Sequence, residues 1–326
     1  MILNKTQSSY YSEIIKGRSV IKTHGSSFFI KHFNCFDSLE LDDIYNEYLQ
    51  SAIQKGLPTN KDRLDQLNKT EQWTEKDNNK IKDLQLFITN AEIGKSKAIL
   101  KRDQDYFLEE LKKAKNELKD LENQKISLIG NSAEIFASKK SYDVLISRSL
   151  YKDSELKTPI IQENDDIADS ELENYYSIYN NHTTEINEKI IKKISISPYF
   201  INIFAICDND VFKFYGKPAI ELTLYQIDLF RNGKKHLHIL SEMGGNIPKN
   251  IEDNPDELVS LYESRKNSQD ILDKSQDQQA TSIVGATKED MERMGISNQT
   301  GPDLGKLAQS KGGRLNMMEI MQALGQ

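Results

Sequence analysis

One series of regularly spaced apolar residues constrains the fold of this chain more than any other feature. Within residues 74–130, apolar residues recur at steps of three and four, which places them along one side of an α-helix. Thr74 and Asp77 have the spacing of a capping box, so the first helix is predicted to begin there. The two apolar series are Ile81, Leu84, Ile88 and Ala91, and then Phe107, Leu111, Ala114, Leu118, Leu121 and Leu128, with Lys125 occupying one slot of the second series.

The two series are out of phase with each other. Continuing the first would place Lys95, Arg102 and Asp105 on the apolar side. Either one long helix changes partner here, or the chain folds back near Gly94. We favour the second arrangement, because two short antiparallel helices can bury their apolar seams on each other. Residues 71–131 are therefore predicted to form a central helical hairpin or short coiled coil, through which copies of the chain could form a homo-oligomer.

Three further segments flank this region, at residues 1–70, 132–263 and 264–326. The first mixes aromatic and small residues, with a short strand expected at 27–33 and a helix at 39–49. The helix is expected to end at the glycine and proline of residues 56–58. The fold class predicted from all segments is mainly α with a small β element (α+β).

Residues 132–263 carry most of the apolar residues. Helices are expected at 171–179 and 186–196, with the second ended by Ser197-Pro198. Two aromatic and β-branched runs, 199–207 and 211–216, flank Asp208-Asn209-Asp210 and predict a β-hairpin across an Asx-rich turn, although the first run could be a buried helix. A helix over 222–230 should then end at the turn signal Asn232-Gly233.

The segment from residue 264 to 326 has no aromatic residue, since the last is Tyr262. Low hydrophobicity and many Gln, Ser and Gly residues predict a flexible C-terminal tail. Within it, four apolar residues share one side of a short amphipathic helix, and methionine-rich stripes adapt well to partner grooves. We therefore expect these residues to bind a partner protein, although the segment could instead fold back onto its own body: Met317, Ile320, Met321 and Leu324.

A catalytic alternative rests on the segment from Thr89 to Ser96, which ends in Gly-Lys-Ser as a phosphate-binding P-loop does. A P-loop needs glycines so that successive backbone N–H groups can surround the phosphate oxygens, and this loop interior has none. A nucleotide-dependent enzyme would use Lys95 and Ser96, with Asp208 after an apolar run as the magnesium ligand. We predict no catalytic residue and no cofactor, and keep this enzyme as the alternative.

Metal and redox motifs are weak in this sequence. His32 and Cys35 have a ligand-like spacing with His24 nearby, but no second Cys/His pair completes a zinc site. His236 and His238 alternate along an expected strand or loop, which would place both on one side. The two cysteines, Cys35 and Cys207, cannot form a disulfide framework. We therefore predict no metal ion and two free thiols.

Net charge and hydropathy also limit the kinds of protein that this chain can be. The formal net charge is −7, which argues against a main role in nucleic-acid binding, so a nucleic-acid scaffold is a lesser alternative. The N-terminus lacks the features of a signal peptide, and the longest apolar run, near 201–207, is far shorter than a membrane span. These features predict a soluble, intracellular protein.

The order of segments also resembles a known class. The helical middle region, the apolar block that includes 215–218 and 222–226, and the tail with a methionine-rich helix resemble virion or tail-assembly proteins of tailed bacteriophages. The resemblance implies a non-enzymatic structural or chaperone-like factor. Its partners would be tail or baseplate subunits, and it would act in the host cytoplasm during assembly or within the virion.

Overall fold

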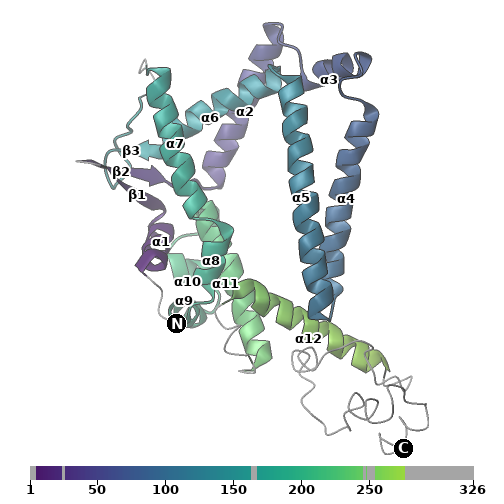
Figure 1. The fold of residues 1–326 in the computed structure, drawn as a ribbon. Helices are drawn as coiled ribbons and strands as arrows, with labels where there is room; N and C mark the ends of the chain where they lie inside the picture. Colours follow the sequence, from purple (N-terminus) through teal and green to yellow (C-terminus); the bar gives the residue numbers. More distant parts are fainter. Residues whose placement is uncertain (1–4, 24–25, 163–166, 245–246, 248–253, 276–326) are drawn as a thin grey trace, which may run out of the picture. The chain divides into compact units, whose positions relative to one another are not determined.

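The fold comes from a computed structural model that describes residues 5–23, 26–162, 167–244, 247 and 254–275. The chain divides into two compact units, residues 1–89 with 112–259 and residues 90–111 with 260–326. It is mainly α with a small β element, as the sequence predicts (Figure 1). The elements in chain order are α1 (Lys5–Lys16), β1 (Arg18–Thr23), β2 (Ser26–Lys31), α2 (Cys35–Gln54), α3 (Asn60–Lys69), α4 (Glu75–Lys97), α5 (Lys101–Ile129), α6 (Ala133–Ser149), β3 (Leu150–Tyr151), α7 (Asp169–Glu185), α8 (Glu188–Ser195), α9 (Pro198–Ile206), α10 (Val211–Tyr215), the 3₁₀-helix η1 (Ala219–Glu221), α11 (Leu224–Met243) and α12 (Pro255–Ser275).

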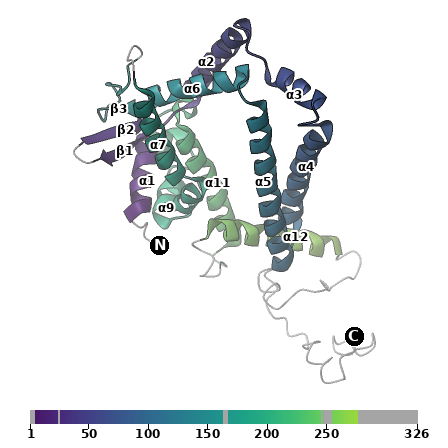
Figure 2. The ribbon, with the colours of Figure 1, turned by 45° about the horizontal axis from the view of Figure 1, so that its top comes forward.

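The β element in the first unit is an antiparallel sheet with the order β1-β2-β3 (Figure 2). β2 corresponds to the strand expected at 27–33, whereas β1 and β3 were not expected. Arg18 of β1 pairs with Lys31, and Leu150 of β3 pairs with Ile30. One side of the sheet packs against α6 and α7 around a buried cluster of Phe28, Ile30, Ile146, Leu150 and Ile161. This packing fixes the end of β2, from which His32 follows.

Helix α2 packs against α6 within the same unit. The Asn34 side chain caps α2 in a reciprocal capping box with Asp37, and the helix ends at Gln54, before the glycine and proline that predicted its end. The Ser141 hydroxyl on α6 donates to the Leu41 carbonyl. These contacts hold α6 along α2.

A second core in this unit lies between α1, α8, α9 and α11. It contains the buried residues Ile14, Ile194, Phe200, Phe204 and Leu229 among others. Gly233 of α11 lies against this core, since a Cβ atom at that position would come within 2.5 Å of the Phe200 ring. The expected turn at Asn232-Gly233 is therefore wrong. The glycine permits close helix packing in the middle of α11, which continues to Met243.

The β-hairpin expected at 199–216 is also wrong. Both runs are helical, as α9 and α10, so the alternative of a buried helix was correct for the first run. The Ser197 side chain caps α9 and Pro198 occupies its first turn, so this dipeptide begins a helix after α8 has ended at Ser195. The turn expected at 208–210 is present, with the Asp210 side chain capping α10.

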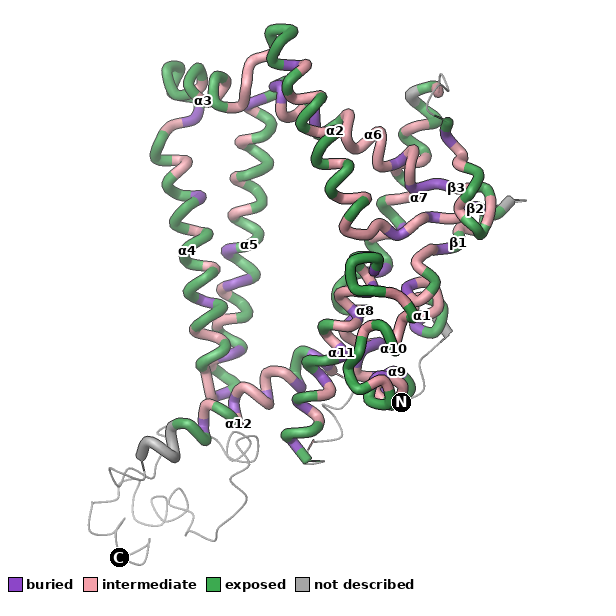
Figure 3. The backbone as a smooth tube through the Cα atoms, turned by 180° about the vertical axis from the view of Figure 1, so that it is seen from behind, coloured by how far each residue is buried: buried purple, intermediate pink, exposed green. Residues whose placement is uncertain are grey.

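Helices α4 and α5 run side by side and antiparallel, which confirms the predicted helical hairpin (Figures 1 and 2). In the first unit, Lys80 forms an ion pair with Glu117 at 2.7 Å. The seam residues are buried or partly buried, whereas most flanking positions are exposed (Figure 3). Thr74 donates from its backbone N–H to Asp77 Oδ2 at 2.8 Å at the predicted start of α4.

The second unit contains the end of α4, the start of α5 and most of α12. The connection lies at residues 98–100, not near Gly94 as expected, because α4 continues to Lys97. Gly94 instead allows close packing, since a Cβ atom there would lie 2.7 Å from the Phe107 ring. α12 extends to Ser275, so the tail expected from residue 264 is helical over its first residues. Ser264 and Ser268, which made this segment look polar, are buried and donate to carbonyl groups of the preceding turn.

Candidate functional site

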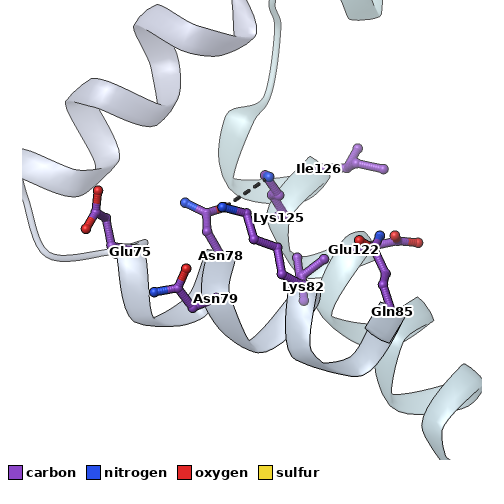
Figure 4. Close-up of a pocket in the computed structure, with 9 residues that line it drawn as sticks. Glu75, Asn78, Asn79, Lys82, Gln85, Glu122, Lys125 and Ile126 are labelled. Carbon is purple, nitrogen blue, oxygen red and sulfur yellow. Dashed lines mark hydrogen bonds between the residues drawn. The ribbon is translucent and has the colours of Figure 1, made fainter. Parts of the chain in front are cut away.

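A groove of about 620 Å³ lies between α4 and α5 within the first unit. Isoleucine, amide and charged side chains line it, so the groove offers apolar surface together with groups that donate and accept hydrogen bonds. Of its isoleucines, Ile81 is 8% exposed and Ile126 is 56% exposed. The residues that line the groove are Glu75, Asn78, Asn79, Ile81, Lys82, Gln85, Glu122, Lys125 and Ile126 (Figure 4).

Asn78 connects the two helices at this groove. Its Oδ1 atom accepts a hydrogen bond from Lys125 Nζ at 3.1 Å (Figure 4). The same atom accepts a hydrogen bond from Trp73 Nε1 at 3.0 Å. Trp73 is buried, with 2% of its surface exposed, so its indole N–H needs an acceptor inside the protein. Lys125 is the single charged residue among the seam positions of α5. Asn78 therefore satisfies two donors that the apolar seam cannot satisfy.

Exposed apolar side chains adjoin the groove on both helices. Leu86 follows Lys82 by four residues, so it lies on the same side of α4, and it is 61% exposed. Ile126 lines the groove from α5. Two acidic residues, Glu75 and Glu122, accompany the two lysines. A groove with equal numbers of acidic and basic residues beside exposed apolar side chains is suited to binding a polypeptide surface rather than a polyanion.

This groove was not predicted from the sequence. One signal for it was present in the sequence, because Lys125 interrupts an otherwise apolar seam. A lysine in that position needs a polar partner on the facing helix. Asn78 could not be chosen as that partner until the pairing of α4 with α5 was known. The predicted partner-binding residues Met317, Ile320, Met321 and Leu324 lie outside the described residues.

The P-loop-like segment from Thr89 to Ser96 lies wholly within α4. Its backbone is helical, so it does not form the phosphate-binding loop that the alternative requires. The Ser96 hydroxyl donates to the Ile93 carbonyl at 2.9 Å. Asp208, the expected magnesium ligand, follows α9 and forms an ion pair with Lys213 at 2.7 Å. Lys95 and Ser96 thus lie on a helix rather than on a phosphate-binding loop, and Asp208 is already paired with a lysine.

The histidines and cysteines are dispersed. Among the described residues, no cluster of three or more His, Cys, Asp or Glu side chains is suited to a metal ion. His236 and His238 both lie on helix α11, which corrects the expected strand or loop. His236 is 1% exposed, whereas the His238 side chain is 61% exposed, so the two do not share a side. Cys35 and Cys207 are free thiols.

Within the described part of the chain, no helix is both long enough and apolar enough to cross a membrane. No protein-family model, curated protein or solved structure gives a significant match to this chain.

Proposed function

We propose that this chain is a non-enzymatic interaction protein and that the groove between α4 and α5 is one of its contact surfaces. The observation that carries the proposal is the exposure of Leu86 and Ile126 beside a groove with a buried isoleucine. Burying both side chains against a partner would remove apolar surface from water, at about 25 cal/mol for each Å². The amide and charged groups around them would give the contact its orientation.

The partner that we propose is another protein. The resemblance to tailed-bacteriophage proteins suggests a tail or baseplate subunit as that partner. The residues Met317, Ile320, Met321 and Leu324 would add a second contact through the C-terminal segment. Two tethered contacts strengthen each other, because binding of the first raises the effective concentration of the second.

The decisive experiment compares two variants in the native source. The double variant Leu86→Glu/Ile126→Glu places two negative charges beside the groove. The control Lys76→Glu changes the net charge by the same amount at an exposed α4 residue that does not line the groove. We expect proteins that co-purify with wild type and control to be depleted at least tenfold from the double variant, as measured by quantitative mass spectrometry.

Recovery of the same proteins with all three forms, at equal abundance, would contradict the groove as a contact surface. Circular dichroism of each variant checks that the helices remain folded, since all three substituted side chains are exposed. The identity of the depleted proteins tests the partner class separately. Tail or baseplate subunits would support the phage proposal, and depletion of unrelated host proteins alone would contradict it.

A further inference from the structure

Helix α2 packs one side against α6 and leaves the opposite side exposed (Figure 3). On the packed side, Tyr48 meets Phe136 of α6 edge to face and Ala52 is buried. Four exposed residues recur at steps of three and four on the opposite side of the helix, which we call the outer face of α2. The outer face consists of Phe36, Leu39, Asp43 and Glu47.

The N-terminal end of the outer face is apolar. Beside Phe36 and Leu39 lie Ile220 of η1 and Leu224 at the start of α11, because η1 contacts α2 and Leu224 donates its backbone N–H to the Phe33 carbonyl at 3.0 Å. Each of these four apolar residues is between 48% and 60% exposed. Large apolar residues that are exposed together indicate a surface that another protein covers.

The other end of the outer face is acidic. Helix α2 contains five acidic residues and no lysine or arginine. Two of the five form ion pairs with basic residues of neighbouring elements, whereas Asp43 and Glu47 form none within the described part of the chain. Charge of one sign beside an apolar surface selects a partner that carries the opposite sign. The outer face is therefore suited to a helix that has apolar residues at one end and basic residues at the other.

The C-terminal segment of this chain has that pattern. Arg314, Met317, Met321 and Leu324 recur at steps of three, four and three, so a helix would carry them on one side. The same spacing would place Glu319 on the opposite side. These residues lie outside the described part of the chain, and their pattern comes from the sequence.

The two patterns match when the helices run antiparallel. Seven residues separate Phe36 from Asp43, and seven separate Arg314 from Met321. Placing Met321 opposite Phe36 therefore brings Arg314 opposite Asp43. Leu324 would then extend past the start of α2, toward the exposed apolar residues of η1 and α11. In a parallel pair with the same alignment, the arginine would lie beside the phenylalanine and the methionine beside the aspartate.

We propose that the outer face of α2 binds residues 314–324 of a second copy of this chain as an antiparallel helix. The contact joins two different surfaces, so the copies associate head to tail. In an open row of copies one C-terminal segment stays free, which leaves it available for the partner contact proposed above. This inference goes beyond the proposed function, because it uses neither the groove between α4 and α5 nor the partner that binds there.

Charge reversal at either surface tests the pairing. We expect Asp43→Arg and Arg314→Asp each to weaken self-association of the full-length protein at least tenfold, because each places like charges opposite each other. The double variant Asp43→Arg/Arg314→Asp exchanges the two charges and should restore association. The control Asp83→Arg makes the same charge change at an exposed residue of α4 and should leave association unchanged. Sedimentation velocity over a series of concentrations measures each dissociation constant.

A mixture of the two single variants determines whether the contact joins different copies. Asp43→Arg retains an intact C-terminal segment, and Arg314→Asp retains an intact outer face. At concentrations where wild type associates, each variant alone should be a monomer, whereas their mixture should form a one-to-one complex and nothing larger. A mixture that stays monomeric would overturn the proposal. So would a wild-type protein that is still monomeric at about 1 mM.

Two results would show that copies associate through another surface, and either would overturn the proposal. One is association of both single variants as strong as that of wild type. The other is loss of association in Leu86→Glu/Ile126→Glu but not in Asp43→Arg, which would place the contact in the groove between α4 and α5. Restored association in the double variant also shows that the charge reversals leave the protein folded.

Discussion

Histidines 32 and 236 show how burial changes the chemistry of single residues in this protein. Each is at least nine-tenths buried, and burial lowers the pKa of each to about 4. The Ser195 hydroxyl donates to the Lys192 carbonyl at 2.7 Å, so its oxygen accepts from Nδ1–H of His236 at 2.8 Å. His32 and His236 are therefore neutral in the folded protein near pH 7, and each has one ring nitrogen bonded to a serine.

These shifts predict that acid destabilises the fold. In the unfolded chain both histidines titrate near their ordinary pKa of 6.5, whereas in the folded protein they titrate near 4. Between these values the unfolded chain binds protons that the folded chain does not, so the free energy of unfolding falls as pH decreases from 6.5 to 4. The loss is about 3 kcal/mol for each histidine at most. Urea unfolding at a series of pH values measures it.

A pair of variants assigns part of this dependence to His236. Asparagine removes the titrating ring, and its side-chain N–H can still donate to Ser195. We expect His236→Asn to show a weaker fall in stability between pH 6.5 and 4 than wild type. The control His238→Asn changes an exposed histidine of the same helix and should retain the wild-type slope. Identical slopes in all three proteins would refute this assignment.

At the scale of elements, the hairpin depends on Asn78 to connect α4 with α5. Asn78→Ala leaves the indole N–H of Trp73 and the ammonium of Lys125 without their shared acceptor. We expect a loss of about 1–3 kcal/mol in the free energy of unfolding, because the indole donor is buried. Asn79→Ala, at the adjacent exposed position, should cost less than about 0.5 kcal/mol. Chemical denaturation measures both, and equal losses would contradict the role of Asn78.

The elements that could be predicted from the sequence are those whose structure follows from the spacing of apolar residues alone. The seam of α4 and α5 follows from steps of three and four residues, and its reversal follows from the break in phase. Residues 199–215 were misread because aromatic and β-branched runs of that length fit a strand as well as a buried helix. The cap at Ser197 and the proline at the first turn of α9 were the deciding signals.

The site residues were harder to predict than the elements. His32 was considered only with Cys35, its neighbour in sequence, yet it contacts Ser19, which lies on β1. Without β1, nothing in the sequence brings residue 19 close to residue 32. Gly94 and Gly233 were taken for turn signals, although each is needed where an aromatic ring from another helix lies against the backbone. Contacts of this kind depend on tertiary packing, which spacing does not reveal.

At the scale of the whole molecule, Gln104 holds the helices of the second unit together through its side-chain hydrogen bonds. This side chain is 3% exposed and bonds Ser264 at 2.7 Å, the Ala98 carbonyl at 2.8 Å and Ser260 at 2.5 Å. Asn267 donates to the Ser96 carbonyl at 2.7 Å. These hydrogen bonds join α12 to the connection between α4 and α5.

Replacing Gln104→Leu should therefore loosen the second unit and leave the first unchanged. The leucine cannot bond the two serines or the Ala98 carbonyl. We expect amide hydrogen exchange to become at least tenfold faster in residues 90–111 and 260–270, with no change in the sheet and α11. Lys101→Leu, an exposed position near the start of α5, is the control. Faster exchange throughout the chain, or none, would contradict this assignment.

The short connection at residues 98–100 also limits how chains of this kind can change length during evolution. Because α4 returns directly into α5, seven residues inserted into one helix shift every seam residue on the far side of the insertion from the connection relative to its partner. The register is restored only if a compensating insertion of equal length occurs in the other helix. Insertions and deletions in descendants of this sequence should therefore occur as matched pairs equidistant from residue 99.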